Sequence, residues 1–253
     1  MPQPTVPQIY PDATALADAA CALIAADSQR AIAERGTFSI ALSGGSTPKA
    51  VYALLASPAW RERIEWGRWL VFWSDERFVS LADPDSSYLL ANQMLLSHVP
   101  VPEDQVFPVA THLPDPESAA MAYELTLTAR LGALPRLDLI MLGMGPDGHT
   151  ASIFPGQPEA RQPIDGLVLA VRNAPKPPPL RVSFSYRLIN AAARALFLAA
   201  GADKAETLAA IFEGQANRAA LPAQGVRPER GELSWMVDAA AAAGLAKSVQ
   251  PSS

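Results

Sequence analysis

The stretch Thr37-Phe-Ser-Ile-Ala-Leu-Ser-Gly-Gly-Ser-Thr-Pro48 joins a short apolar run to a small, Gly-rich segment. Residues 37–42 are typical of a buried strand, and Pro48 is well placed to open the helix that follows. The same order, an apolar strand followed by a polar loop, recurs at 69–77, 137–149 and 194–204. Short apolar strands that alternate with helices predict an α/β fold, with a mostly parallel sheet flanked by helices on both faces.

Helical patterns fill most of the gaps between these strands. Apolar residues recur at helical spacing in the segments 12–35, 87–99, 116–131 and 204–213. In a parallel sheet the carboxyl ends of the strands meet at one edge, and ligands bind beyond that edge. We therefore expect the polar loops to share one cleft, which would hold most of the unusual polar chemistry of the chain.

The composition excludes several classes of protein. The chain has 253 residues, 49% of them apolar and 18% charged, which is typical of a folded protein and fits one domain over residues 1–253. A net charge of −5 argues against nucleic-acid and membrane-surface partners, and no apolar run approaches the ~20 residues that span a bilayer. The single cysteine, Cys21, excludes an internal disulfide, and no pair of His or Cys residues has metal-ligand spacing. The first seven residues do not resemble a secretory signal, so we expect a cytoplasmic protein without a metal.

The Gly-rich loop Ser43-Gly44-Gly45-Ser46-Thr47 allows two interpretations. Its backbone N–H groups and the dipole of the helix that it opens could cradle an anion. It could equally be a tight turn between a strand and a helix. It is not a Walker A loop, because no G-x-x-x-x-G-K-[ST] sequence occurs in the chain.

A second Gly-rich loop carries the histidine that is best placed for chemistry. Gly143-Met-Gly145-Pro-Asp147-Gly148 formally matches a dinucleotide fingerprint, but Asp147 would repel a pyrophosphate, and no acidic residue follows the next strand to hold a ribose. His149 comes next, at the expected start of a helix, where the loop would aim its imidazole at the cleft. This position suits a general base and a helix cap equally. His98 and His112 are expected at the surface.

Five further charged residues lie in or near these loops. Asp75, Glu76 and Arg77 follow the strand at 69–73, where solvated loop charges are the simplest interpretation. Arg181 follows a Pro run and Lys204 opens a helix, and each alone is typical of a surface cation. A bound phosphate or carboxylate would give both cations a role as donors of charge-assisted hydrogen bonds. No serine-hydrolase elbow or zinc-protease motif is present in the sequence.

Taken together, four motifs resemble the signatures of the 6-phosphogluconolactonase family. They are Leu42-Ser-Gly-Gly-Ser-Thr-Pro48, Ser74-Asp-Glu-Arg-Phe-Val79, Leu142-Gly-Met-Gly-Pro-Asp-Gly-His-Thr-Ala-Ser-Ile-Phe-Pro-Gly156 and Pro175-Lys-Pro-Pro-Pro-Leu-Arg181. They occur in the order and spacing of the family, and the resemblance runs from about Thr37 to Trp235. It implies a Rossmann-like fold, shared with glucosamine-6-phosphate deaminases, and no obligatory cofactor. It also implies hydrolysis of 6-phospho-D-glucono-1,5-lactone to 6-phosphogluconate, the second step of the oxidative pentose phosphate pathway.

The resemblance implies a role for each candidate residue. His149 would be the base that activates water, Asp147 would orient its imidazole, and Arg77 would stabilise the negative charge that develops on the carbonyl oxygen. The substrate, a small phosphorylated sugar lactone, would be bound by Ser43, Gly44, Gly45, Ser46, Thr47, Asp75, Gly145, Arg181 and Lys204. Asp75 would either hold its loop or bind sugar hydroxyls. We expect a monomer or a weak homo-oligomer.

Two alternatives come from other functional classes. The deaminase branch of the same superfamily carries Asn-Glu before the Pro-Gly that follows Asp-Gly-His, whereas residues 151–154 here read Ala-Ser-Ile-Phe, without a carboxylate. The Asp-Glu-Tyr loop of that branch is replaced here by Asp75-Glu76-Arg77. A non-catalytic sugar-phosphate-binding regulator would have lost the chemistry, and the presence of His149, Asp147 and Arg77 argues against it.

Overall fold

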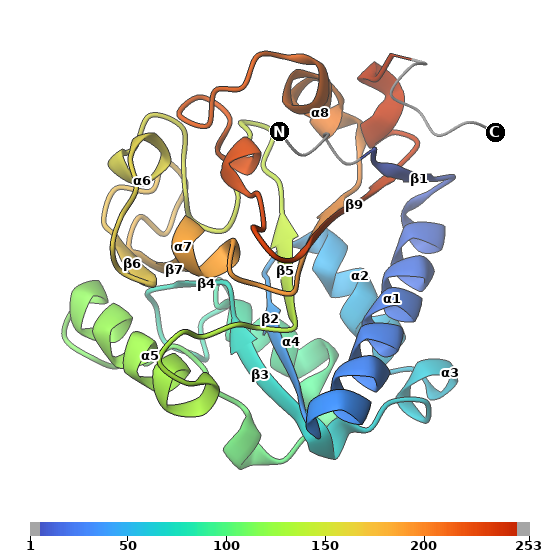
Figure 1. Ribbon diagram of the computed structural model, residues 1–253, viewed down its shortest axis with the longest axis vertical. Coiled ribbons are helices and arrows are strands. Elements are labelled where there is room, and N and C mark those ends of the chain that lie inside the picture. Colours follow the sequence, from blue (N-terminus) through green and yellow to red (C-terminus); the bar gives the residue numbers. More distant parts are fainter. Residues whose placement is uncertain (1–5, 247–253) are drawn as a thin grey trace.

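A six-stranded sheet forms the centre of the computed structural model, which describes residues 6–246 (Figure 1). Every pairing between neighbouring strands of this sheet is parallel. In spatial order the strands are β1 (Gln8–Tyr10), β9 (Glu232–Asp238), β8 (Arg194–Ala199), β5 (Leu139–Gly143), β2 (Phe38–Leu42) and β3 (Trp69–Trp73). The prediction of a mostly parallel sheet is confirmed. The single domain expected over 1–253 stays a prediction, and its ends, 1–5 and 247–253, lie outside the described residues.

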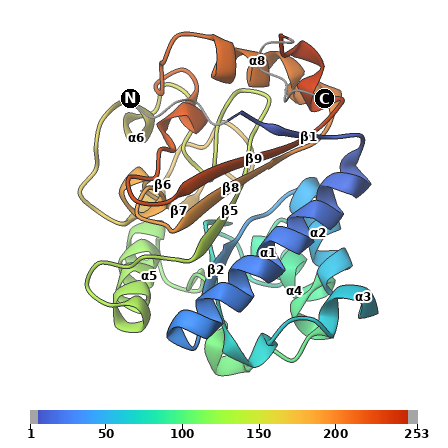
Figure 2. The same cartoon turned by 45° about the vertical axis from the view of Figure 1, so that its right-hand side comes forward.

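Helices cover both faces of this sheet, as the sequence predicts. One face carries α1 (Ala13–Arg35), α2 (Ser46–Leu55) and α4 (Ser87–Met94), whereas α5 (Pro116–Leu131) lies on the other side, as Figures 1 and 2 show. The remaining helices are α3 (Pro58–Arg61), α6 (Pro158–Arg161), α7 (Tyr186–Ile189) and α8 (Ala205–Glu213). None of the described helices has both the length and the apolar character needed to cross a membrane. The cytoplasmic location stays a prediction.

The two faces of the sheet contribute to two separate hydrophobic cores. Within β5, Leu139 and Met141 pack with α1 and α2, whereas Ile140 and Leu142 pack with α5. The same alternation in β8 places Leu196 and Leu198 in the first core and Phe197 in the second. Side chains of a strand alternate between its faces, so a strand buried on both sides is apolar throughout. This explains the continuous apolar runs of the sequence.

Helix α1 shows how local sequence sets the boundaries of an element. Asp12 precedes the helix, and its carboxylate accepts hydrogen bonds from the N–H groups of Thr14 and Ala15. Gly36 ends the helix with φ +81°, a conformation that favours glycine, and its N–H donates to the carbonyl of Ile32. The expected helix over 12–35 is therefore confirmed almost to the residue.

A second, three-stranded sheet corrects the prediction for the loop charges. Strands β4 (Asp75–Arg77), β7 (Arg181–Phe184) and β6 (Val168–Val171) pair antiparallel on the side of the main sheet that carries α5 (Figure 1). Asp75 and Glu76 are buried, so the interpretation of solvated loop charges is wrong for both. Three consecutive charged residues carry no apolar pattern, and only pairing with β7 makes them a strand.

Three further expectations for the helices are wrong in detail. The segment 87–99 ends its α-helix at Met94, and a short 3₁₀ turn, Leu96–His98, follows. The first helix after the Gly-rich loop 143–148 is α6, at Pro158, so no helix starts at His149. Helix α2 begins at Ser46, two residues before Pro48. His98 and His112 are exposed, as expected.

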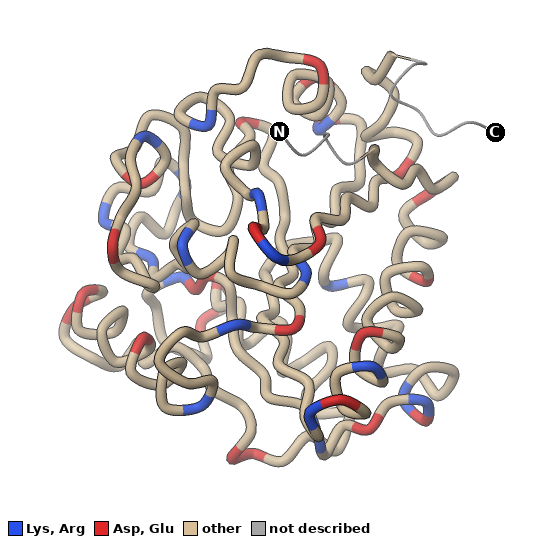
Figure 3. Tube along the Cα trace, in the orientation of Figure 1, with Lys and Arg blue, Asp and Glu red and all other residues tan. Residues whose placement is uncertain are grey.

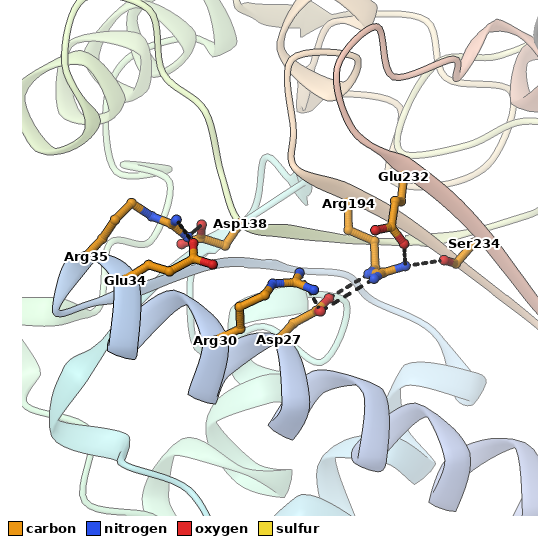
Figure 4. A network of polar contacts seen from close by, with 8 residues as sticks. All are labelled: Asp27, Arg30, Glu34, Arg35, Asp138, Arg194, Glu232 and Ser234. Atoms are coloured by element: carbon orange, nitrogen blue, oxygen red, sulfur yellow. Dashed lines mark hydrogen bonds and ion pairs between the residues drawn. The ribbon is translucent and has the colours of Figure 1, made fainter.

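Positions of basic and acidic residues are interspersed along the described chain (Figure 3). One cluster lies at the amino ends of the strands (Figure 4), at the edge opposite the loops considered below. Arg194, the first residue of β8, is buried and donates to Asp27 of α1 over 2.6 Å and to Ser234 over 2.7 Å. It also pairs with Glu232 of β9, at 2.7 Å. This cluster ties α1 to the sheet.

We predict that Arg194→Met lowers the free energy of unfolding by about 3 kcal/mol, because it leaves the buried Asp27 carboxylate with only the exposed Arg30 as an ionic partner. Urea denaturation would measure the change. The matched control is Arg35→Met, which removes the half-exposed pair with Asp138 and should cost less than about 1 kcal/mol. Equal losses in the two variants would contradict the central role of Arg194.

Candidate active site

A cleft of about 280 Å³ lies at the carboxyl ends of β2, β5 and β8, beside β4 and β7. Its walls include every residue proposed from the sequence except Asp147, which reaches the cleft through His149. The proposed residues that line it are Ser43, Gly44, Gly45, Ser46, Thr47, Asp75, Arg77, Gly145, His149, Arg181 and Lys204. The expectation that the polar loops share one cleft is confirmed.

The loop 43–47 carries the chain from β2 into α2 at the edge of this cleft. Tyr52, fully buried in α2, fixes its start, because the Tyr52 hydroxyl accepts from the Ser43 N–H and donates to the Ser43 carbonyl. Gly45 has φ +109°, which few other residues adopt. The amino terminus of α2 thus borders the cleft with its unpaired N–H groups and its positive dipole end.

The short strand β4 sends alternate side chains in opposite directions. Asp75 and Arg77 line the cleft, and Asp75 accepts a hydrogen bond from the Ser152 hydroxyl over 2.7 Å. Arg77 donates to the carbonyl of Asp85 over 2.6 Å. Its guanidinium lies against the Gly-rich loop, since a Cβ on Gly44 would stand 3.7 Å from the Arg77 Cζ.

Glu76 points away from the cleft and holds the start of α4. Its carboxylate accepts from the N–H groups of Arg77, Ser87 and Tyr88, each over 2.7 Å. Burial raises the pKa of Glu76, and these three hydrogen bonds oppose the rise. Glu76 is therefore a structural carboxylate, a role that the sequence analysis missed.

His149 and Asp147 form a close pair above the turn 145–148. The Nδ1 of His149 lies 2.5 Å from Oδ1 of Asp147, and the imidazole packs on the ring of Phe154 at a centroid distance of 4.7 Å. A carboxylate only accepts hydrogen bonds, so Nδ1 carries the proton, and Nε2 of the neutral ring is free to accept one. Burial raises the pKa of Asp147, but the hydrogen bond and charge of His149, and the charge of Lys176, outweigh this and hold it well below its usual range. Asp147 is thus ionised at neutral pH.

The turn below this pair is fixed from several directions. The N–H of Gly145 donates to the His149 carbonyl over 3.0 Å, and the N–H of Ala223 donates to the Gly148 carbonyl over 2.9 Å. Thr207 of α8 donates to the carbonyl of Pro146. Gly145 leaves room for the imidazole, because a Cβ at this position would stand 2.0 Å from Nδ1 of His149.

The two other cations predicted from the sequence are both engaged within the protein. Lys204 pairs with Asp203 at 2.7 Å and is largely buried, with a side chain 19% exposed. Arg181 is also buried and donates to backbone carbonyls of the loop that precedes β7. The interpretation of Arg181 as a surface cation is therefore wrong, because β7 places it inside the molecule.

Two charged residues that the sequence analysis did not select also line the cleft. Lys176 lies 3.7 Å from Asp147, and Asp203 holds Lys204. Lys176 belongs to the Pro-rich motif 175–181, but its position beside Asp147 depends on how that loop folds back. Asp203 adjoins Lys204 in the sequence, and this proximity of opposite charges was the only feature of the sequence that could have indicated its contact with Lys204.

Comparison with known proteins gives the class of this chain. The pattern of the family described as Glucosamine-6-phosphate isomerases/6-phosphogluconolactonase matches residues 11–235, and the chain belongs to this family.

Within the family, similar proteins are named as lactonases. The 6-phosphogluconolactonase of Nostoc sp. is 40% identical over 242 residues, which cover 94% of this chain and 97% of that protein. The solved structure of 6-phosphogluconolactonase from Trypanosoma brucei has a TM-score of 0.81 and 30% sequence identity, and the match covers 96% of this chain and 100% of that one. A monomeric glucosamine-6-phosphate deaminase, 22% identical with a TM-score of 0.77 over 94% of this chain and 98% of that one, shares the fold.

We predict that Gly145→Ala separates the imidazole of His149 from Asp147, because the added methyl group would occupy the position of the ring. A displacement of about 1 Å can cost about a hundredfold in rate, so any reaction that uses this imidazole should slow by that order. The side-chain ¹⁵N signals of His149 would report the lost hydrogen bond, and thermal melting would report the fold.

The matched control is Gly143→Ala, two residues earlier in the same loop. Neither glycine has a positive φ, and a Cβ on Gly143 would meet nothing within 4 Å. Gly143→Ala should therefore leave the His149 signals unchanged. Unchanged signals in Gly145→Ala as well would contradict the packing described here.

Proposed function

We propose that this chain hydrolyses 6-phospho-D-glucono-1,5-lactone to 6-phospho-D-gluconate, with His149 as the base that activates water. The observation that carries the proposal is that one cleft combines an imidazole fixed by a carboxylate with a Gly-rich loop at a helix amino terminus. The first can promote attack of water on a lactone carbonyl, and the second can hold a phosphate. The named activity of the Nostoc relative supports the same substrate.

The reaction needs only proton transfers and a stabilised negative charge. Nε2 of His149 takes a proton from water as the water oxygen forms a bond to C1. Asp147 stabilises the imidazolium that results, because its ionised carboxylate lies against Nδ1. When the bond between C1 and the ring oxygen breaks, the imidazolium returns the proton to that oxygen. The carboxylic acid left at C1 then loses the second proton of the former water to solvent and becomes the carboxylate. A δ-lactone is an activated ester, so water can attack it directly and no intermediate bonded to the protein is required.

The phosphate of the substrate would lie at the other end of the cleft. The loop 43–47 offers backbone N–H groups at the start of α2, and Lys204 offers a charge-assisted hydrogen bond. Asp203 holds the Lys204 ammonium, and this hydrogen bond keeps the pKa of Asp203 below its usual value. Arg77 lies against Gly44, so its position favours a role beside the phosphate over the oxyanion role that the sequence analysis gave it.

The alternative functions find less support at this site. A deaminase of the related branch would need a carboxylate in the segment 151–154, where this chain has Ala-Ser-Ile-Phe. A non-catalytic regulator has no need of an imidazole held at 2.5 Å by a carboxylate. The absence of a cofactor and of a metal, and a monomeric or weakly oligomeric state, stay predictions.

We predict that His149→Asn lowers kcat by about 10²–10⁴, the usual contribution of general acid–base catalysis, and leaves the affinity for 6-phosphogluconate nearly unchanged. Asp147 stays ionised at and below neutral pH, because its pKa is held well below its usual range, so a loss of wild-type kcat just below neutral pH would not come from Asp147. The measurement is initial rate against pH, with spontaneous lactone hydrolysis subtracted.

Thermal melting of His149→Asn separates a catalytic role from a structural one. A variant that melts like the wild type and keeps its kcat would show that some other residue is the base. Asp147→Asn should also lower kcat, by a smaller or comparable factor, since it removes the group that orients the imidazole.

We predict that Lys204→Ala weakens binding of the phosphorylated lactone by about 1.5–3 kcal/mol, the contribution of one hydrogen bond to a charged group. Unphosphorylated gluconolactone should be a poor substrate and should be almost indifferent to the change. Lys49→Ala is the matched control, because Lys49 is exposed on α2 and does not line the cleft. Equal sensitivity of both lactones to Lys204→Ala would remove the phosphate assignment.

A further inference from the structure

The cations that line the cleft within residues 6–246 are held in different ways. They are Arg77, Lys176, Arg181 and Lys204. Arg77 lies against the Gly-rich loop, and Lys204 is bonded to Asp203 at 2.7 Å. Among these four cations, Lys176 is the one that pairs with Asp147. Its ammonium lies 3.7 Å from Oδ2 of Asp147, and the other oxygen of the same carboxylate, Oδ1, is hydrogen-bonded to the proposed base His149.

The pairing of Lys176 leaves it able to turn to a ligand. Its side chain is 43% exposed and that of Asp147 is 33% exposed, and 3.7 Å is long for an ion pair. Exposed pairs of this kind contribute little free energy, so a bound anion can replace the partner at small cost. The ammonium is therefore available at the end of the cleft where negative charge develops on a lactone oxygen and remains on the carboxylate of the product.

Arg181 holds the loop that carries Lys176. Its Nε donates to the carbonyl of Pro178 over 3.1 Å, and its Nη2 donates to those of Lys176 and Pro177 over 3.2 and 3.3 Å. Its guanidinium also lies over the ring of Phe154, which packs on His149. Arg181 is buried, with 5% of its surface exposed, and two of its three side-chain nitrogens, Nε and Nη2, donate to this one loop.

We propose that Lys176 binds the C1 carboxylate of the product and the oxyanion that precedes it, and that Arg181 is the positioning residue that fixes the loop of Lys176. This inference rests on the proposed function. It adds to that function the cation that binds the C1 end of the substrate. It also changes the role expected for Arg181, from direct contact with the phosphate to support of Lys176. A positive charge already in place where the oxyanion develops accelerates the reaction, because the protein does not have to reorganise when the negative charge forms.

Two ligands that differ only at C1 test the role of Lys176. 6-Phosphogluconate carries a carboxylate at C1, whereas glucitol 6-phosphate carries a neutral CH₂OH and the same phosphate. Isothermal titration calorimetry should show that Lys176→Met weakens binding of 6-phosphogluconate by about ten- to a hundredfold and leaves that of glucitol 6-phosphate nearly unchanged. Lys176→Arg, which keeps the charge, should restore most of the difference. Equal weakening of both ligands, or no weakening of either, would overturn the assignment.

Arg181→Lys tests the positioning role, because lysine keeps the charge and loses the forked donors that reach three carbonyls. The readout is the ratio of the two dissociation constants, which partial unfolding of the sample does not change. A contact between Arg181 and the phosphate would weaken both ligands alike. The positioning role predicts weaker binding of 6-phosphogluconate alone, and little further loss when Lys176→Met is added.

The wild-type protein distinguishes failure of this inference from failure of the proposed function. If wild type hydrolyses the phosphorylated lactone and the variants bind both ligands equally well, only the role of Lys176 is overturned. If wild type neither hydrolyses the lactone nor binds 6-phosphogluconate, the proposed function falls, and the inference falls with it.

Discussion

The parallel alignment of β2, β3, β5 and β8 is the constraint on which the site depends. Each of these strands ends at the same edge of the sheet, so residues more than 150 positions apart, from Ser43 to Lys204, meet around one cleft. Both faces of the sheet are covered, and these strands are apolar over most of their length, which leaves their ends as the main place for polar side chains. The charged cluster around Arg194 lies at the opposite edge, where it ties α1 to the sheet without contact with the cleft residues.

Buried charged side chains in the cleft and behind it fix the loops that form the site. Glu76 holds the start of α4, and Asp75 holds Ser152. Arg181 holds the Pro-rich loop through three carbonyls. In each case a charged group removed from water is satisfied by hydrogen bonds to backbone or hydroxyl groups, which is the condition for burying it at tolerable cost. The cleft therefore owes its shape to polar contacts as much as to the apolar cores.

The sequence predicted the parts of the fold in which an apolar strand is followed by a polar loop and a helix, because this order recurs along the chain. Strands such as β2 and β3 are apolar runs followed by polar loops, and the motifs placed His149, Asp147 and the loop 43–47 correctly at one edge. It did not predict β4, because Asp75-Glu76-Arg77 becomes a strand only through pairing with β7. It did not identify Lys176 either, since the approach of Lys176 to Asp147 is a contact between two loops 29 positions apart in the sequence. Contacts made between distant segments leave no local periodicity to read.

The central claim is that one cleft binds the two ends of a single substrate, with the phosphate at the start of α2 and the reacting carbon at His149. The most direct measurement is a crystal structure of the chain with 6-phosphogluconate. The account predicts the phosphate against residues 43–47 and Lys204, and C1 at the end of the cleft that His149 and Lys176 line. A phosphate bound beside Asp147, or a ligand seated outside this cleft, would contradict it.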